Sequence, residues 1–216
     1  MKKLFLVLLL IVSTLGNAQQ RPFWNEINAF VKQDSINKPK DKVILFVGSS
    51  SFRLWKDIKT DLNNDNILNR AFGGATLLDM IYYKDKNLLN YNPSKIVIYC
   101  GENDVASSEK VDGNEVFKRF KKLYKIIRKQ YPTVPLVFVS IKPCILRWSM
   151  KDRMIDANER ISRFLSHKKQ TIFVNIWDAM LENGEPKKDI FIQDNLHMNA
   201  KGYAIWIEKL KGVVNE

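Results

Sequence analysis

The chain has 216 residues, 45% of them hydrophobic and 27% charged, and its formal net charge is +12. A chain of this length normally folds as one domain with one substantial core. The basic balance would attract an anionic partner, but in the basic stretch over residues 118–129 the charges alternate with apolar residues at helical spacing. That pattern is typical of a solvated helix face. Because no nucleic-acid-binding motif accompanies it, we expect no nucleic-acid partner.

The chain begins with a short apolar segment. Two lysines precede an apolar run over residues 4–12, and small residues follow, the last of them Ala18. This arrangement predicts a secretory signal peptide over residues 1–18 and a single domain over residues 19–216. The apolar run is much shorter than the roughly 20 residues that cross a bilayer, which disfavours a transmembrane anchor. We therefore expect a secreted or periplasmic domain.

Short apolar runs alternate with amphipathic stretches along the rest of the chain. The apolar runs predict strands over residues 43–47, 67–69, 96–100, 136–141 and 171–176. The amphipathic stretches predict helices over residues 52–62, 76–83, 114–131, 152–167 and 199–211. Continuous β-branched runs are typical of parallel strands buried on both faces, with the intervening helices covering those faces. The sequence thus predicts an α/β protein, a three-layer α/β/α sandwich around a parallel sheet.

Unusual polar residues follow the predicted strands. A glycine and three serines follow the first strand, Gly73-Gly74 follows the second, Gly101-Glu102-Asn103-Asp104 follows the third, and Lys142-Pro143 follows the fourth. The carboxyl ends of parallel strands meet at one edge of a sheet, where ligands gather in such folds. We therefore expect these segments to converge on one site.

One of the two histidines has the sequence context of a catalytic base. His197 comes three residues after Asp194, just before the last predicted helix. A carboxylate at this spacing would hold the imidazole ring and stabilise its charged form. The alternative is a histidine that caps or packs the last helix. The other histidine, His167, lies in a basic string and is interpreted as a surface residue at a helix end.

A base of this kind needs a nucleophile, and the turn after the first strand offers three serines. We favour Ser50, because Ser49 directly follows the glycine and Ser51 leads into the next helix. The alternative is that the serines cap that helix or bind a phosphate. The Gly-x-Ser-x-Gly elbow of α/β-hydrolases does not fit, because Phe52 stands where its second glycine should be.

Acyl transfer also needs hydrogen-bond donors for the developing oxyanion, each worth on the order of 3 kcal/mol. The candidates are the backbone N–H groups of Ser50 and Gly74 and the side-chain amide of Asn103. Taken alone, the glycine pair would indicate a tight turn and Asn103 a loop cap. Together with the serine, the acid and the histidine, they favour an acyl-transfer site.

Four segments resemble, in the right order, the four motif blocks of the SGNH hydrolases, also called GDSL-like lipases or acylhydrolases. They are Gly48-Ser49-Ser50-Ser51, Asn69-Arg70-Ala71-Phe72-Gly73-Gly74, Gly101-Glu102-Asn103-Asp104 and Asp194-Asn195-Leu196-His197. The resemblance implies that Ser50, Asp194 and His197 form a catalytic triad. It implies that Gly74 and Asn103 join the Ser50 amide in an oxyanion hole. It also implies a flavodoxin-like five-stranded parallel sheet, with no metal and no organic cofactor.

The chain departs from the family pattern at two positions. Ser49 replaces the aspartate of the GDSL string, and Ala71 stands where many relatives carry glycine. The loop after the fourth predicted strand resembles that of bacterial members similar to platelet-activating-factor acetylhydrolase. Its residues Lys142, Arg147 and Trp148 are candidates for the substrate rim, with a packing role as the alternative.

The two cysteines, Cys100 and Cys144, both fall at the ends of predicted strands. A disulfide between them is conceivable in an exported protein, but one bridge is not the framework that small secreted folds use. We favour two buried free thiols.

These observations predict a secreted serine esterase that hydrolyses a carboxylic ester. A short acyl group on a carbohydrate or small lipid is favoured, because the chain shows no long apolar lid insertion. The expected partner is thus a small-molecule or carbohydrate ester. Two non-catalytic alternatives stay open: a flavodoxin-like module that cradles a phosphate at residues 48–51, and a carbohydrate-binding relative whose triad is misaligned.

Overall fold

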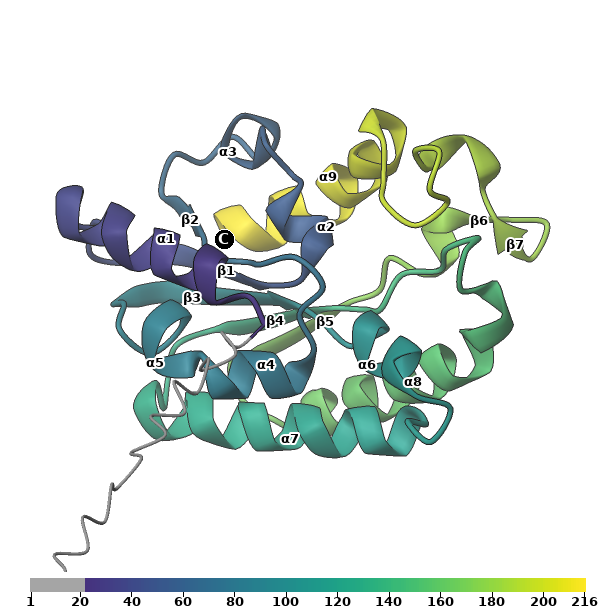
Figure 1. Cartoon of the computed structure of the whole chain (residues 1–216), viewed down its shortest axis with the longest axis horizontal. Helices are drawn as coiled ribbons and strands as arrows, with labels where there is room; N and C mark the ends of the chain where they lie inside the picture. Colours follow the sequence, from purple (N-terminus) through teal and green to yellow (C-terminus); the bar gives the residue numbers. More distant parts are fainter. Residues whose placement is uncertain (1–21) are drawn as a thin grey trace, which may run out of the picture.

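The computed structural model describes residues 22–216, so the predicted signal peptide over residues 1–18 lies outside the described residues. Five parallel strands form the main sheet in the order β2-β1-β3-β4-β5. They are β1 (Val43–Gly48), β2 (Ile67–Asn69), β3 (Pro93–Tyr99), β4 (Leu136–Val139) and β5 (Thr171–Val174). Helices cover both faces of this sheet (Figure 1). The predicted three-layer sandwich with a flavodoxin-like five-stranded sheet is confirmed.

The apolar character of the strands follows from their burial. Every residue of β1 and β4 is buried, as expected for parallel strands covered on both faces. The edge strand β5 is less buried, and its Ile172 is exposed. Because the strands are parallel, their carboxyl ends share one edge, which lies to the right in Figure 1, where α2 and α6 follow β1 and β3.

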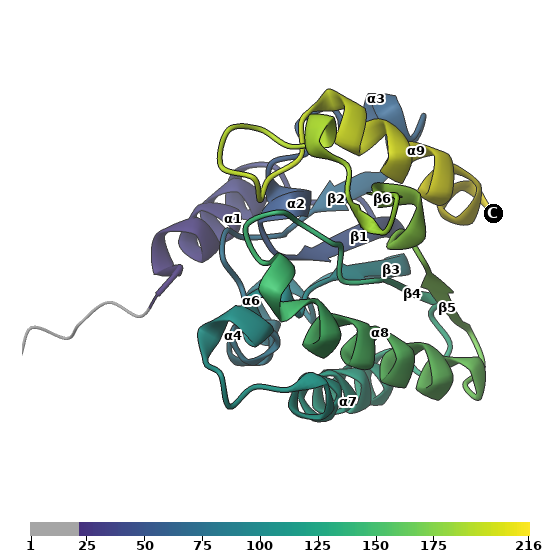
Figure 2. The same ribbon diagram turned by 90° about the vertical axis from the view of Figure 1, so that its right-hand side faces the viewer.

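The helices divide between the two faces, as Figure 2 shows. One face carries α4 (Leu77–Tyr82), α6 (Glu102–Ser107), α7 (Gly113–Gln130) and α8 (Lys151–Ser166). The other carries α2 (Ser50–Arg53), α3 (Ile58–Asp61) and α9 (Ala200–Asn215). Helix α1 (Trp24–Ile36) packs against α5 (Lys84–Asn87). A hydrophobic core lies on each side of the sheet, one around Phe120 and Phe138, the other around Phe46 and Trp206.

Helix α7 is amphipathic, as its sequence pattern predicts. Its buried face carries Val116, Phe120, Leu123 and Ile127, and its exposed face carries Lys118, Lys122, Lys125 and Lys129. The Asp112 side chain caps its first turn by accepting a hydrogen bond from the Glu115 backbone N–H. Within residues 22–216, no helix combines the length and apolar character needed to cross a membrane.

The helix predicted over residues 52–62 is instead two short helices, α2 and α3, separated by residues 54–57. The reason is tertiary, because Trp55 turns into the core, stacks on Tyr203 of α9 and donates its indole N–H to Asp61 at 2.6 Å. Helices α1, α5 and α6 were not predicted. Also unforeseen were a hairpin of β6 (Leu181–Glu182) and β7 (Glu185–Pro186), and 3₁₀ turns at Trp148–Met150, Asp178–Met180 and Lys188–Ile190.

Candidate active site

A glycine at the end of β1 determines how the serine-bearing turn leaves the sheet. Gly48 has φ +142°, and a Cβ on it would stand 1.9 Å from the carbonyl oxygen of Tyr99 on β3. Only glycine allows this approach of two neighbouring strands. The Ser49 N–H then donates to the same Tyr99 carbonyl at 3.0 Å, and α2 begins at Ser50.

The three serines have different surroundings. Ser49 and Ser51 are buried, and the Ser51 carbonyl accepts a hydrogen bond from the Tyr203 hydroxyl. Ser50 is half-buried, so its hydroxyl alone of the three stands at the surface edge of the turn. This placement agrees with the choice of Ser50 as the candidate nucleophile.

The loop before α9 presents His197 to this serine. Asp194 accepts backbone hydrogen bonds from Leu196 at 2.9 Å and His197 at 2.8 Å through its Oδ1. Its Oδ2 lies 2.5 Å from His197 Nδ1, and His197 Nε2 lies 2.9 Å from Ser50 Oγ. With Nδ1–H donating to Asp194, Nε2 is free to accept the serine proton. The three predicted triad residues therefore form one continuous hydrogen-bonded chain.

Asp194 is ionised in this arrangement. The slight burial of this exposed carboxylate would by itself raise its pKa, but the hydrogen bonds from the His197 ring and from the His197 and Leu196 backbone lower that pKa to about 2. A carboxylate that accepts several hydrogen bonds is stabilised in its charged form. Asp194 can therefore hold the imidazole ring and balance the charge that the ring acquires when it takes a proton.

The predicted oxyanion donors come from three segments: Ser50 begins α2, Gly74 lies in the loop before α4, and Asn103 lies in the first turn of α6. Gly74 has φ +72°, a backbone conformation that favours glycine. Among residues 22–216, the backbone N–H groups of Ser50 and Gly74 donate to no protein acceptor. The Asn103 side chain uses one of its two Nδ2 hydrogens for the Ala75 carbonyl, at 3.1 Å. All three candidates thus keep an N–H group for a substrate oxygen.

Asp104 fixes the start of α4, the helix that follows the Gly74 loop. Its buried carboxylate accepts the Leu77 backbone N–H at 2.9 Å and Arg119 Nη1 at 3.0 Å. Thr76 and Asp79 form a capping box at the same helix end. Burial raises the pKa of Asp104, although these hydrogen bonds oppose the shift. The second acid of the Gly-Glu-Asn-Asp segment therefore supports the loop on which Gly74 lies.

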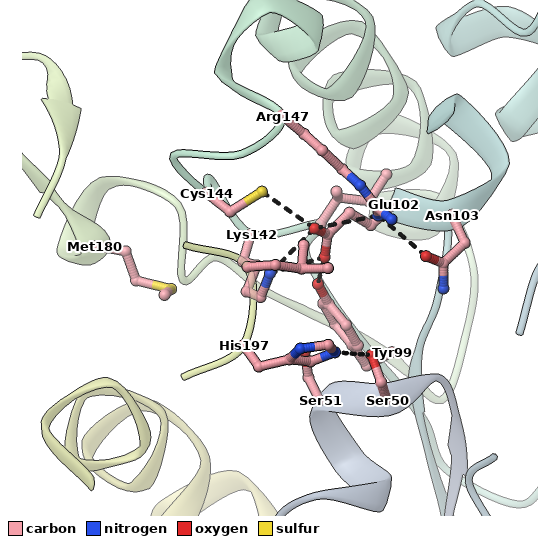
Figure 3. A network of polar contacts seen from close by, with 12 residues as sticks. Ser50, Ser51, Tyr99, Glu102, Asn103, Lys142, Cys144, Arg147, Met180 and His197 are labelled. Atoms are coloured by element: carbon pink, nitrogen blue, oxygen red, sulfur yellow. Dashed lines mark hydrogen bonds and ion pairs between the residues drawn. The ribbon is translucent and has the colours of Figure 1, made fainter. Parts of the chain in front are cut away.

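A buried polar network lies behind Asn103 (Figure 3). The Glu102 carboxylate accepts from the Tyr99 hydroxyl at 2.6 Å and from Lys142 Nζ at 2.9 Å. It also contacts Cys144 Sγ at 3.2 Å and Arg147 Nη1 at 3.4 Å. Burial alone would raise the pKa of Glu102, but Lys142 and Arg147 hold it below its ordinary value. Glu102 is therefore a buried carboxylate shared by two cations.

The rim assignment of Lys142 is wrong. Only 1% of its side chain is exposed, and its ammonium group forms an ion pair with Glu102. A buried lysine needs such an ionised partner. Arg147 is half-buried and reaches Asn103 Oδ1 at 3.0 Å. Trp148 stacks on Trp177 with ring centroids 6.0 Å apart and is also half-buried. The packing alternative therefore holds for Lys142, and Trp148 has at least a packing contact.

Both cysteines are buried and free. Cys100 Sγ contacts the Ala75 carbonyl at 3.4 Å, and Cys144 belongs to the Glu102 network. Burial and the nearby Glu102 carboxylate raise the pKa of Cys144 to about 12, which leaves the thiol protonated.

Sequence reasoning missed Tyr99 and Cys144 as parts of the site region, and it assigned no role to Glu102, although it expected the segment that carries Glu102 at the site. One signal was available, since Lys142 stands at the end of an apolar strand, where an unpaired charge is costly. The acid that pairs with it could not be chosen from the sequence. Among the described residues, no group of three or more His, Cys, Asp or Glu side chains is placed to hold a metal ion.

Residues 41–205 match the model of the GDSL-like Lipase/Acylhydrolase family, so the chain belongs to this family. No curated protein matches the chain. Three solved structures are similar in fold. A protein from Streptococcus pneumonia, provisionally described as a platelet activating factor, has a TM-score of 0.76 at 21% identity and covers 88% of this chain and 91% of its own. A GDSL-like lipase from Bacteroides thetaiotaomicron VPI-5482 has a TM-score of 0.74 at 18% identity, and the match covers 88% of this chain and 97% of the lipase. A carbohydrate esterase family 3 protein from Talaromyces cellulolyticus has a TM-score of 0.63 at 15% identity, and the match covers 82% of this chain and 97% of the esterase.

Proposed function

We propose that this protein is a serine esterase that hydrolyses a carboxylic ester. The observation that carries the proposal is the continuous contact from Ser50 Oγ through the His197 ring to Asp194, with distances of 2.9 Å and 2.5 Å. A serine hydroxyl becomes a useful nucleophile when a base within hydrogen-bond reach takes its proton. Membership of the GDSL-like Lipase/Acylhydrolase family supports the same reaction class.

The reaction would proceed in two halves. His197 Nε2 takes the Ser50 proton while Ser50 Oγ attacks the ester carbonyl, and the oxyanion accepts hydrogen bonds from the amides of Ser50, Gly74 and Asn103. The protonated His197 then gives its proton to the leaving alcohol as the ester C–O bond breaks. Water attacks the acyl carbon on Ser50 while His197 accepts a proton from that water. The bond between the acyl carbon and Ser50 Oγ then breaks, His197 returns the proton to Oγ, and the acid leaves.

For the substrate we propose a short acyl group, such as acetate, on a carbohydrate. The similarity in fold to a carbohydrate esterase family 3 protein supports this choice, although fold alone does not fix a substrate. Asp194 is exposed and Ser50 is half-buried, so a bulky alcohol such as a sugar could approach the proposed triad. Higher activity on dispersed long-chain esters than on acetylated sugars would contradict the acetyl proposal.

We also propose that the protein is exported and that the predicted signal peptide over residues 1–18 is removed. The basis is the charged start and apolar run of that segment. N-terminal sequencing of the protein recovered from a bacterial host would test it. A first residue near Gln19, in the secreted or periplasmic fraction, supports export, and an intact Met1 in the cytoplasm contradicts it.

Hydrolysis of p-nitrophenyl acetate by the wild type, Ser50→Ala and His197→Ala tests the reaction class. Matched controls are Ser166→Ala and His167→Ala, because both side chains are exposed at the end of α8 and contact no site residue. We expect turnover to vanish in the first two variants and to persist in the controls. Equal rates in all five proteins would mean background hydrolysis and would favour a binding module instead.

A further inference from the structure

The side-chain amide of Asn103 is held at both ends. Arg147 Nη1 donates to its Oδ1 at 3.0 Å, and its Nδ2 donates to the Ala75 carbonyl at 3.1 Å. An asparagine amide can turn over, exchanging oxygen and nitrogen, unless its partners define which is which. Arginine has donors and no acceptor, so Arg147 fixes the oxygen on its own side. The nitrogen must then point towards the Gly74 loop.

Arg147 is fixed in turn by Glu102. The same Nη1 lies 3.4 Å from Glu102 Oε1, and 16% of the Arg147 side chain is exposed. Glu102 is anchored by Lys142 and by the Tyr99 hydroxyl, both fully buried. In Figure 3, Arg147, Glu102 and Asn103 form one line of contacts above Ser50 and His197. The Arg147 guanidinium is therefore held by a carboxylate that is itself buried and fixed by two buried side chains.

The network also carries an excess of positive charge. Lys142 and Arg147 are two cations around the one Glu102 carboxylate, while the Cys144 thiol and the Tyr99 hydroxyl stay neutral, since burial raises the pKa of both. Preorganised positive charge close to a developing oxyanion stabilises it, above all where water is excluded. The excess charge lies next to Asn103, one hydrogen bond from a predicted oxyanion donor.

We infer that Arg147 is a positioning residue of the proposed esterase. Held by Glu102 and Lys142, it fixes and polarises the Asn103 amide so that one Nδ2–H points at the substrate oxygen when the tetrahedral intermediate forms. The inference rests on the proposed function, because it needs an oxyanion to be bound. It assigns Arg147 to the transition state and gives it no part in binding the ground-state ester.

The test compares kcat and KM for p-nitrophenyl acetate in Arg147→Met, Asn103→Ala and the double variant, each in the full chain. If Arg147 acts through Asn103, Asn103→Ala lowers kcat by roughly 100- to 1000-fold and Arg147→Met by roughly 10- to 100-fold, each with little change in KM. The double variant should be no slower than Asn103→Ala alone, because residues in one network are not additive. Arg147→Lys, which keeps the charge, should recover part of kcat.

Arg153→Met is the matched control. Arg153 lies on α8 and binds the backbone carbonyls of Val105, Ser108 and Val111, away from the triad. Its loss should lower the thermal midpoint and leave kcat of the folded protein unchanged. Guanidinium added at concentrations that do not unfold the protein should restore part of kcat to Arg147→Ala, and urea should not.

The outcomes separate the two proposals. An inactive wild type would reject the esterase itself. If the wild type is active, two results would reject the positioning role and leave the esterase proposal intact. One is an unchanged kcat in Arg147→Met. The other is a double variant whose fold-loss in kcat equals the product of the two single losses. Equal losses of kcat in Arg147→Met and Arg153→Met, together with no rescue of Arg147→Ala by guanidinium, would show that Arg147 has a structural role only.

Discussion

His197 Nε2 lies 2.9 Å from Ser50 Oγ, although 147 positions separate the two residues in the chain. The contact depends on Asp194, which holds the imidazole through its Nδ1 and so leaves Nε2 unprotonated towards the serine. Asp194 in turn is fixed by two backbone N–H groups of its own loop. The acid therefore sets both the direction and the tautomer of the base.

Asp194→Asn should keep the fold and remove most of the activity. The amide can turn its NH₂ group to the ring and so favour the wrong tautomer, and we expect kcat for p-nitrophenyl acetate to fall by about 10³- to 10⁴-fold. Asp189→Asn is the control, because Asp189 is an exposed acid before the same loop and pairs with Lys201. A loss below tenfold in Asp194→Asn would contradict the assigned role.

The pH profile should show one ionisation on its acid side. The rate needs a neutral His197, so kcat/KM should rise with pH as the imidazole loses its proton and then level off. Asp194, whose pKa is lowered to about 2, stays ionised throughout this range. Because its pKa lies below the ordinary value, Asp194 favours the folded state above that value and loses this effect only as the pH falls towards 2. A slope of two in log(kcat/KM) between about pH 4 and 7 would show that a second group titrates.

Gly48→Ala should destabilise the protein strongly. The new methyl group would overlap the Tyr99 carbonyl oxygen, at 1.9 Å, and φ +142° is unfavourable for alanine. We expect a loss of more than about 3 kcal/mol in the free energy of unfolding, measured in urea. Gly212→Ala is the matched control with the opposite sign, because Gly212 is exposed in α9 and a Cβ there would meet nothing within 4 Å. Its free energy of unfolding should increase by roughly 0.5–1 kcal/mol.

Lys142→Met should also destabilise the protein, by an amount that depends on pH. It leaves the buried Glu102 carboxylate with Arg147 as its one cation, and breaking a buried pair typically costs about 3–5 kcal/mol. In the wild type the pKa of Glu102 lies below its ordinary value, so ionised Glu102 stabilises the fold at neutral pH. Without Lys142, burial should raise that pKa.

Urea unfolding of Lys142→Met at about pH 7 and pH 5 would measure this effect. We expect a smaller penalty at the lower pH, where protonation relieves the buried charge. Adding Glu102→Gln should recover part of the lost stability at pH 7, since the amide carries no charge to leave unpaired. A penalty that is the same at both pH values would mean that Lys142 acts by packing alone.

Much of the fold could be predicted because its signals are local. Continuous apolar runs at residues 43–47 and 136–139 can be buried on both faces only in a covered parallel sheet. The alternation of runs and amphipathic stretches then fixed the layers. Helix α1 was missed because its pattern of apolar residues is weak, and only Ile27 in it is buried. The break after α2 was missed because the cause, Trp55 packing on α9, lies far away in the chain.

The residues that could do the chemistry can be identified from their positions in the chain. Ser50, His197 and Asn103 stand at strand ends or loop positions that a parallel sheet must bring to one edge, so their convergence follows from topology. The contacts that hold them in place depend on packing between distant segments. Lys142 at a strand end could have faced solvent or the interior, and only the position of Glu102 across the fold decides this. The energy of a buried charge depends on its partner, and that partner is chosen by packing between segments far apart in the chain.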